Sequence, residues 1–189
     1  MSPFPVRALL GAWLAFSLPA CGAVLFNEIQ YHPVENAAFN ADGSPVLDLT
    51  EDVHEFIELL NTGPGPADLG GWALAGGIQF SFPTGTTLPE GGFLVLSGHP
   101  DRIEAVYTLP TGSVLGPWIG HLSNRRETLE LRDRNGSLVE SVSYRSDSPW
   151  PISANALGAD DDWTHLHSED YQYRGRSLER VSPTHPASD

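Results

Sequence analysis

Positive charge is scarce in this chain of 189 residues. Ten basic residues, all of them arginine, stand against 24 acidic residues, and the formal net charge is −14 at pH 7. Nucleic-acid backbones and anionic membranes are themselves negative, so a surface of this sign repels both. The composition therefore argues against general nucleic-acid binding and against peripheral attachment to anionic lipid. It leaves carboxylates available for divalent cations.

Cysteine is equally scarce, because Cys21 is the single one in the chain. A disulfide within the chain is thereby excluded, and stability must come from core packing. The sequence also lacks long helical periodicity, internal repeats, coiled-coil heptads and low-complexity tracts. By contrast, the chain has 19 glycines and 16 prolines spread along its length. This abundance favours many short strands joined by turns.

The longest apolar run, Ala8–Leu18, lies at the N-terminus behind Arg7 and is interrupted only by Ser17. A run of this length is too short to span a bilayer stably, but it has the length of the apolar region of a signal peptide. We therefore predict a secretory signal peptide over residues 1–23.

Two processing routes are open for this segment. Cys21-Gly22-Ala23 places small residues for cleavage before Val24, which would give a secreted protein. Leu18-Pro19-Ala20-Cys21 resembles a lipobox, whose cysteine would be acylated and would anchor a lipoprotein to a membrane. We favour plain secretion, because Pro19 is unusual in a lipobox and because a strand-like run at Val24 leaves no flexible tether.

Short runs of β-forming residues, separated by Gly- and Pro-containing turns, fill most of the remaining chain. Pro100–Tyr107 is the one segment with spacing typical of one or two helical turns. The main predicted strands are Val24–Tyr31, His54–Asn61, Ile78–Phe82, Phe93–Ser97 and the two arms of a hairpin over residues 128–144. This pattern predicts an all-β fold, a two-sheet β-sandwich.

The hairpin carries the strongest local signal. Two β-forming runs flank Arg134-Asn135-Gly136, and Asn-Gly supplies the positive φ angles that a tight turn needs. Glu140 interrupts the apolar alternation of the second run, so a bulge or a three-residue loop is needed to restore the register. Asn135-Gly136-Ser137 also matches a glycosylation sequon, which we interpret as turn chemistry.

Three segments, in order, resemble the lamin-tail domain as it occurs in secreted bacterial proteins. They are VLFNEIQYHP (Val24–Pro33), EFIELLNTGPGPADLGGWAL (Glu55–Leu74) and LSNRRETLELRDRNGSLVESVSY (Leu122–Tyr144). The resemblance implies an immunoglobulin-like sandwich over residues 24–150, with a role in interaction or attachment. Residues 151–189 are then a C-terminal extension, or a linker toward a possible next module.

The second of these segments supplies residue types that suit architecture. Its strand turns apolar residues inward, its Asp-Leu-Gly-Gly corner needs glycine, and its tryptophan fills the core. Because Glu55 and Glu58 point to opposite faces of a strand, they form no acid–base pair, and nothing in the segment pairs a nucleophile with a base. The motif residues are Glu55, Ile57, Glu58, Leu59, Asn61, Asp68, Leu69, Gly71 and Trp72.

The densest acidic cluster comprises Asp160, Asp161, Asp162 and Asp170, with Glu169 beside the last. Loop carboxylates and carbonyls are the ligands that Ca²⁺ prefers, although the spacing matches no EF-hand. The cluster is therefore a candidate Ca²⁺ site, with a solvated acidic loop as the alternative. Ca²⁺ is accordingly the candidate cofactor of this cluster.

Histidine and tryptophan offer two further candidates. His165 and His167, with a nearby aspartate, have the spacing to hold a transition metal, but they lack a third histidine or cysteine ligand. Trp118, Trp150 and Trp163 lie in loop-like stretches, where they either stack on sugars or pack at the rim of the core.

Taken together, these patterns predict a secreted, non-catalytic interaction or structural module that is a monomer and binds an unknown protein or a cell-surface glycan. Two alternatives stay open: an N-terminal accessory domain of a larger secreted enzyme, and a Ca²⁺-dependent glycan-binding module.

The signal peptide makes a direct prediction. Full-length protein expressed in a bacterial host should be recovered from the medium with Val24 as its first residue, because the small residues before it fit signal peptidase. Intact-mass measurement of the exported protein checks this. A membrane-bound product that carries acyl chains on Cys21 would contradict plain secretion and support the lipoprotein route.

Overall fold

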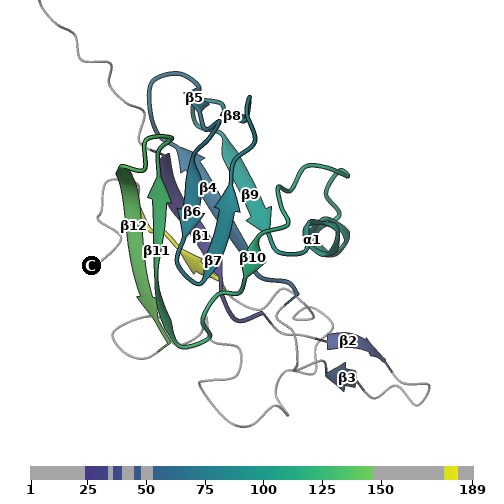
Figure 1. Ribbon diagram of the computed structural model, residues 1–189. Helices are drawn as coiled ribbons and strands as arrows, with labels where there is room; N and C mark the ends of the chain where they lie inside the picture. The colour runs from purple at the N-terminus through teal and green to yellow at the C-terminus, as the bar shows by residue number, and fades with distance from the viewer. Residues whose placement is uncertain (1–23, 34–35, 40–44, 48–52, 147–176, 183–189) are drawn as a thin grey trace, which may run out of the picture.

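Two packed β-sheets make up the fold in the computed structural model, which describes residues 24–33, 36–39, 45–47, 53–146 and 177–182 (Figure 1). One sheet has four strands and the other has five, and all pairings between their strands are antiparallel. The predicted all-β two-sheet sandwich is thereby confirmed. Within the described residues, no helix is both long enough and apolar enough to cross a membrane.

The four-stranded sheet has the order β13-β1-β4-β9 and the five-stranded sheet the order β10-β7-β6-β11-β12. Two further pairs, β2 with β3 and β5 with β8, form small sheets of their own. The bounds are β1 Val24–Gln30, β2 Asn36–Phe39, β3 Pro45–Leu47, β4 Phe56–Asn61, β5 Ala67–Asp68, β6 Ala73–Ala75, β7 Ile78–Ser81, β8 Thr87–Leu88, β9 Phe93–Ser97, α1 Pro100–Tyr107, β10 Ile119–Gly120, β11 Arg126–Arg132, β12 Leu138–Arg145 and β13 Leu178–Glu179.

The core lies between the inner faces of the two sheets. On β4 the alternation places Ile57 and Leu59 inward, both fully buried, as the sequence predicts. From the opposite sheet, Leu129 and Leu131 of β11 pack into the same cluster. Trp72 closes the core beside them, with 7% of its surface exposed.

A bulge interrupts β1 and explains a break in its apolar spacing. Phe26 pairs with Leu59, whereas Glu28 pairs with Glu58, so Asn27 is the extra residue. An extra residue shifts the side-chain alternation by one position. Because of the bulge, the inward-facing side chains on either side of it are spaced three residues apart instead of two, and both still reach the same core.

A second bulge restores the register of the β11–β12 hairpin. Leu131 pairs with Glu140 and Arg132 pairs with Leu138, so Val139 is unpaired between them. This is the bulge that the sequence requires where Glu140 breaks the apolar alternation. Its effect is to turn Leu138, which is 52% exposed, to the opposite face of β12 from Glu140 and the buried residues that follow.

Helix α1 covers the outer side of the four-stranded sheet near β9. Ile103 of α1 is buried against Phe56 and Val114, and Tyr107 meets the Phe56 ring edge-on with ring centroids 5.8 Å apart. Strand β9 therefore has apolar contacts on both faces, as its continuous apolar run predicts, although its first residue, Phe93, is 57% exposed.

The last described strand, β13, extends the sandwich beyond the boundary that the sequence suggests at residue 150. Leu178 pairs with Ile29 of β1, and its side chain enters the core with 8% exposure. Residues 151–189 are thus not simply a linker, because part of this stretch supplies an edge strand. A two-residue strand carries too little periodicity to be found in sequence.

At the end of β4, the buried side chain of Asn61 joins two turns. Its amide group donates to the carbonyls of Gly65 and Leu88, both at 2.9 Å, and its Oδ1 accepts the Gly63 N–H at 2.9 Å. The residue is fully buried. Asn61 therefore satisfies three backbone groups that would otherwise lie in the protein interior without partners.

Replacement of Asn61 should be costly. We expect Asn61→Ala to lower the free energy of unfolding by about 2–4 kcal/mol, because three buried backbone groups lose their partners. Urea denaturation of the two purified proteins measures the change. The exposed Gln79→Ala is the control and should cost no more than about 0.5 kcal/mol. Equal effects of the two substitutions would contradict this role of Asn61.

Candidate functional site

The carboxylate of Glu55, just before β4, lies inside the sandwich. Its two oxygens lie 3.1 and 3.0 Å from the Leu122 nitrogen, whose N–H they accept, and only 2% of the residue is exposed. The Glu55 carbonyl in turn accepts the Ser97 hydroxyl at 2.7 Å. Since Leu122 begins the third motif segment, Glu55 ties the second segment directly to it.

A second carboxylate, Glu127 of β11, organises the loops beside this contact. It accepts the Ser123 N–H at 3.0 Å and also the N–H of Gly77. The Tyr144 hydroxyl lies 2.9 Å from the Ser123 carbonyl and 3.3 Å from Glu127. A Cβ on Gly77 would lie 2.3 Å from Glu127, so this close approach needs glycine.

Two stacked tyrosines form the apolar wall of the network. The rings of Tyr31 and Tyr144 lie 4.7 Å apart with an interplanar angle of 27°. Burial raises the pKa of Tyr31 to about 12. Burial also raises the pKa of Tyr144, and the nearby Glu127 and Glu55 charges add to the effect. Both phenols therefore stay neutral at physiological pH and serve packing and hydrogen bonding.

These carboxylates and tyrosines therefore serve to fix the backbone and loops around them. Glu55 is closed to solvent and engaged with a backbone N–H, so it is in no position to exchange protons with a bound substrate. Among the residues that the structure describes, no group of three or more histidine, cysteine, aspartate or glutamate side chains is arranged to hold a metal ion.

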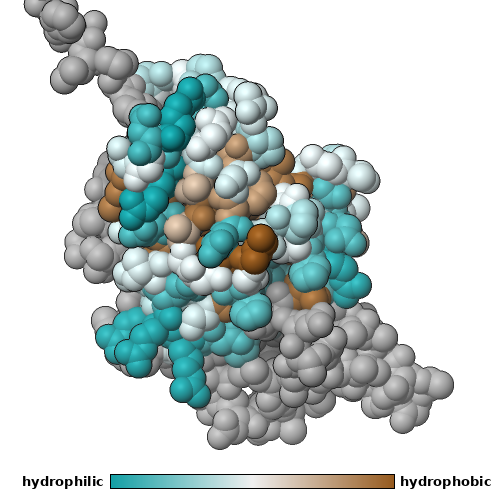
Figure 2. Space-filling model, in the orientation of Figure 1, coloured by the Kyte–Doolittle hydropathy of each residue, from teal (hydrophilic) through white to brown (hydrophobic). Residues whose placement is uncertain are grey.

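The outer face of the five-stranded sheet presents small and apolar side chains. Figure 2 shows this face, with apolar surface over β6, β7 and β10 and hydrophilic surface over the β11–β12 side. Ala73 and Ala75 of β6 are partly exposed, and Ile119 of β10 is 74% exposed. Polar Gln79 and Ser81 of β7 lie beside them. We call these five residues the outer patch. Ile119 is the one large apolar side chain that is exposed in this patch.

On the outer side of the four-stranded sheet, three glutamates form one row. Glu28 of β1 lies directly opposite Glu58 of β4 on one side and Glu179 of β13 on the other. The Asn27 amide donates to Glu58 at 2.7 Å. Burial raises the pKa of Glu58, the Asn27 hydrogen bond lowers it, and the charges of Glu28 and Glu179 raise it further. Like charges at opposed positions destabilise a sheet.

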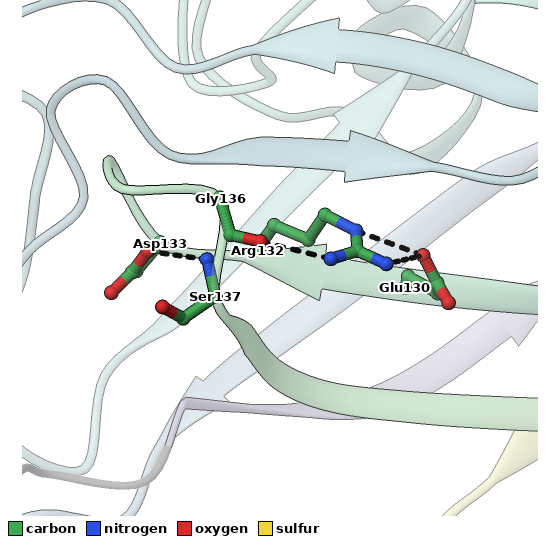
Figure 3. A network of polar contacts seen from close by, with 5 residues as sticks. All are labelled: Glu130, Arg132, Asp133, Gly136 and Ser137. Carbon is green, nitrogen blue, oxygen red and sulfur yellow. Dashed lines mark hydrogen bonds and ion pairs between the residues drawn. The ribbon is translucent and has the colours of Figure 1, made fainter.

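Figure 3 shows the turn between β11 and β12. Arg132 bridges it, with Nε and Nη2 at 2.9 and 2.7 Å from Glu130 and Nη1 at 2.8 Å from the Gly136 carbonyl. The Asp133 carboxylate accepts the Ser137 N–H at 2.8 Å. Three residues, 134–136, lie between the hydrogen-bonded Asp133 and Ser137, and only Gly136, with φ at +80°, is left-handed. The sequence predicted positive φ angles for the Asn-Gly pair, but only its glycine has one.

The same loop reaches across to the Asp-Leu-Gly-Gly corner. Arg134 donates to Asp68 at 2.7 Å, and the other Asp68 oxygen accepts the Gly70 N–H at 2.9 Å. The hydrogen bond from Arg134 and that from Gly70 lower the pKa of Asp68. Both side chains of the ion pair are more than half exposed, so it orients the loop and adds little stability.

The motif residues thus occupy three settings. Core positions are Ile57, Leu59, Leu69 and Trp72; buried polar positions are Glu55 and Asn61; and the surface holds Asp68, Gly71 and the partly exposed Glu58. Gly71 has φ at +79°, which suits the turn before Trp72. Glu55 and Glu58 lie on opposite faces of the strand and are not brought together.

Several candidates lie outside the described residues. These are the acidic cluster Asp160, Asp161, Asp162 and Asp170, the pair His165 and His167, the tryptophans Trp150 and Trp163, and the signal peptide. Trp118 is described and is buried, with 6% exposure, so it packs at the rim of the core. A Cβ on Gly98 would lie 2.8 Å from its indole nitrogen, which shows how closely the two residues pack.

Sequence reasoning missed two polar contacts. For Glu127, the sequence offers only a weak indication of a structural role, namely its place in the third motif segment, five residues after Leu122. The pair Glu140 and Arg180 joins β12 to the residue after β13, with 13% and 8% of the side chains exposed. Nothing in the sequence links two residues so far apart. The one available clue is a charged residue at an apolar position of β12.

The glutamate row predicts a pH dependence of stability. Because its folded-state pKa is raised, Glu58 binds its proton more tightly in the folded than in the unfolded chain. Stability is then lost as pH rises from 4.5 through the raised pKa. Glu58→Gln carries no charge, so its gain in melting temperature over the wild type should be larger at pH 7 than at pH 4.

Thermal denaturation at the two pH values measures this difference. Glu179→Gln should act in the same direction, since it removes a charge from the same row. Glu130→Gln is the opposite control, because it removes a partner of Arg132 and should lower the melting temperature at pH 7. A Glu58→Gln gain that is the same at both pH values would rule out repulsion in the row.

Comparison with known proteins agrees with the architecture and motifs described above. A search of curated proteins finds no match. The model of the family described as Lamin Tail Domain matches residues 18–146, more than half of the chain. The match covers both sheets apart from β13, and the family has an immunoglobulin-like fold. By its motifs, its sandwich and this match, the chain belongs to the Lamin Tail Domain family.

Proposed function

We propose that this chain is an exported, non-catalytic interaction module that binds a protein or glycan at the cell surface. The observation that carries the proposal is the use of the polar motif residues. Glu55 and Asn61 are buried, and their side chains form hydrogen bonds with backbone groups of the domain itself. The motif therefore builds a scaffold, and binding falls to the surface.

The outer patch is the surface that suits a partner best. Ile119 exposes 74% of its surface beside the small side chains of β6, on a face built by regular strands. Small residues on a sheet let a partner approach closely, and an exposed apolar side chain can enter a pocket on that partner. The arrangement favours a contact with a protein, or with the apolar face of a sugar ring.

Export is supported by the start of the folded domain. Val24 is fully buried and already pairs with Asn61 across the first pairing of the sheet. An acylated Cys21 would leave only Gly22 and Ala23 between lipid and sheet, which is very little chain for a tether. Cleavage directly before Val24 gives a domain that begins at its first strand.

A binding comparison tests the proposal. Fluorescently labelled residues 24–189 are applied to immobilised cell-wall polysaccharide and, separately, to immobilised secreted proteins of the source organism. Ile119→Asp should weaken the binding at least about tenfold, because it places a charge in the centre of the contact. Phe93→Asp, an exposed apolar position on the other sheet, is the matched control and should bind as the wild type does.

Each alternative has its own outcome. Turnover of the polysaccharide by the purified domain would contradict a non-catalytic role. Binding that is lost in Phe93→Asp and kept in Ile119→Asp would move the contact to the other sheet. Binding that requires Ca²⁺ and is abolished by a chelator would favour the calcium-dependent module predicted from Asp160, Asp161, Asp162 and Asp170.

A further inference from the structure

The outer edge of β1 is closed by side chains over part of its length. Phe26 donates its N–H to Glu140 of β12 at 2.5 Å, and its carbonyl accepts Nε of Arg180 at 2.9 Å. These are backbone groups that an adjacent strand would otherwise bind. Glu140 and Arg180 also form an ion pair that is largely buried. We call the outer edge of β1, together with Glu140 and the core residues that Leu178 covers, the slot.

The segment Ser177–Arg180 fills this slot with each of its residues in a defined place. The Ser177 hydroxyl donates to Glu28, and Leu178 is buried in the core. Glu179 lies opposite Glu28 in the ladder, and the Arg180 N–H donates to the Asn27 carbonyl at 2.8 Å. The slot therefore recognises a short extended peptide through backbone pairing, one apolar anchor and one arginine.

The pairing of this segment with β1 is short and includes one repulsive contact. Only two residue pairs connect β13 to β1. One of them sets Glu179 directly against Glu28, and like charges at opposed positions destabilise a sheet. The apolar anchor and the arginine oppose this repulsion. Because its pairing is confined to one sheet edge, the segment can open locally without unfolding of the two sheets.

The connection between β12 and this segment is long. Residues 147–176 separate them, and an extended chain of that length can reach roughly 100 Å at about 3.3–3.6 Å per residue. The covalent path therefore permits Ser177–Arg180 to reach the slot of a neighbouring molecule. In an exchanged pair every contact of the slot is the same as in the single chain, which is why strand exchange is a low-cost route to dimers.

We propose that the slot on the β1 edge binds the Ser177–Arg180 segment of a second copy of this chain, so that molecules at high concentration exchange their C-terminal strands. Glu140 selects the incoming segment through its arginine, and the core opening selects leucine. Neither selection depends on what the outer patch binds. The single chain is a monomer when dilute, and exchange links copies where they accumulate.

Cysteine cross-linking of the mature chain, residues 24–189, tests the exchange, since this chain contains no cysteine of its own. One preparation carries Glu28→Cys and the other Glu179→Cys, at positions that face each other only when the strand occupies the slot. The mixture is incubated at high concentration and oxidised. A disulfide between the two chains, identified by peptide mass spectrometry, is the expected product.

A control mixture pairs Glu179→Cys with Ser81→Cys, which lies on the outer face of the other sheet. The slot mixture should yield at least about tenfold more linked heterodimer, which corresponds to about 1.4 kcal/mol of preference for the slot. A single chain with both Glu28→Cys and Glu179→Cys shows that the disulfide can form. Equal yields in the two mixtures would overturn the proposal.

A third variant tests recognition of the arginine. Adding Arg180→Ala to the Glu179→Cys chain removes the partner of Glu140 and of the Phe26 carbonyl. The yield of linked heterodimer should then fall severalfold toward the control. Circular dichroism of each chain establishes that it is folded before mixing. An unchanged yield from a folded Arg180→Ala chain would refute recognition by Glu140.

Discussion

The contact between the Glu55 carboxylate and the Leu122 N–H joins the start of β4 to the loop before β11, and it is buried inside the sandwich. Where the chain passes from one sheet to the other, its backbone leaves the hydrogen-bonded ladder inside the protein. A buried N–H without a partner costs about 1–3 kcal/mol. Glu55 removes that cost from the loop before β11, and Glu127 does the same for neighbouring N–H groups. Asn61 likewise binds buried backbone groups at the opposite end of β4.

Seen this way, the polar residues of the domain divide into two kinds. Those inside, such as Glu55, serve backbone groups and leave no capacity for a ligand. Those outside, such as the glutamate row or the Arg134–Asp68 pair, are screened by solvent and set local geometry or charge. An immunoglobulin-like fold of this kind can carry different surface chemistry without change to its core.

Much of the fold follows from local pattern, and the rest depends on contacts that no local pattern reveals. Alternation identified β4 and β7, turn chemistry identified the β11–β12 hairpin, and the charged Glu140 signalled a bulge. By contrast, β13 is two residues long, and its pairing with β1 spans nearly the whole chain. Its partner contact, Arg180 with Glu140, joins residues 40 positions apart in sequence. For the same reason Ile119 is an ordinary apolar residue in the sequence and becomes distinctive only through its exposure.

The place of β13 has a consequence for the order in which the domain is completed. Val24 emerges from the ribosome or from a translocation pore long before Arg180 does. Strand β1 can pair with β4 as soon as Asn61 is available, but its outer edge stays open until the C-terminal segment arrives. For most of synthesis the nascent chain thus carries an unprotected strand edge. The first strand to be made is the last to be closed, and a chain released before Arg180 would keep that edge open permanently.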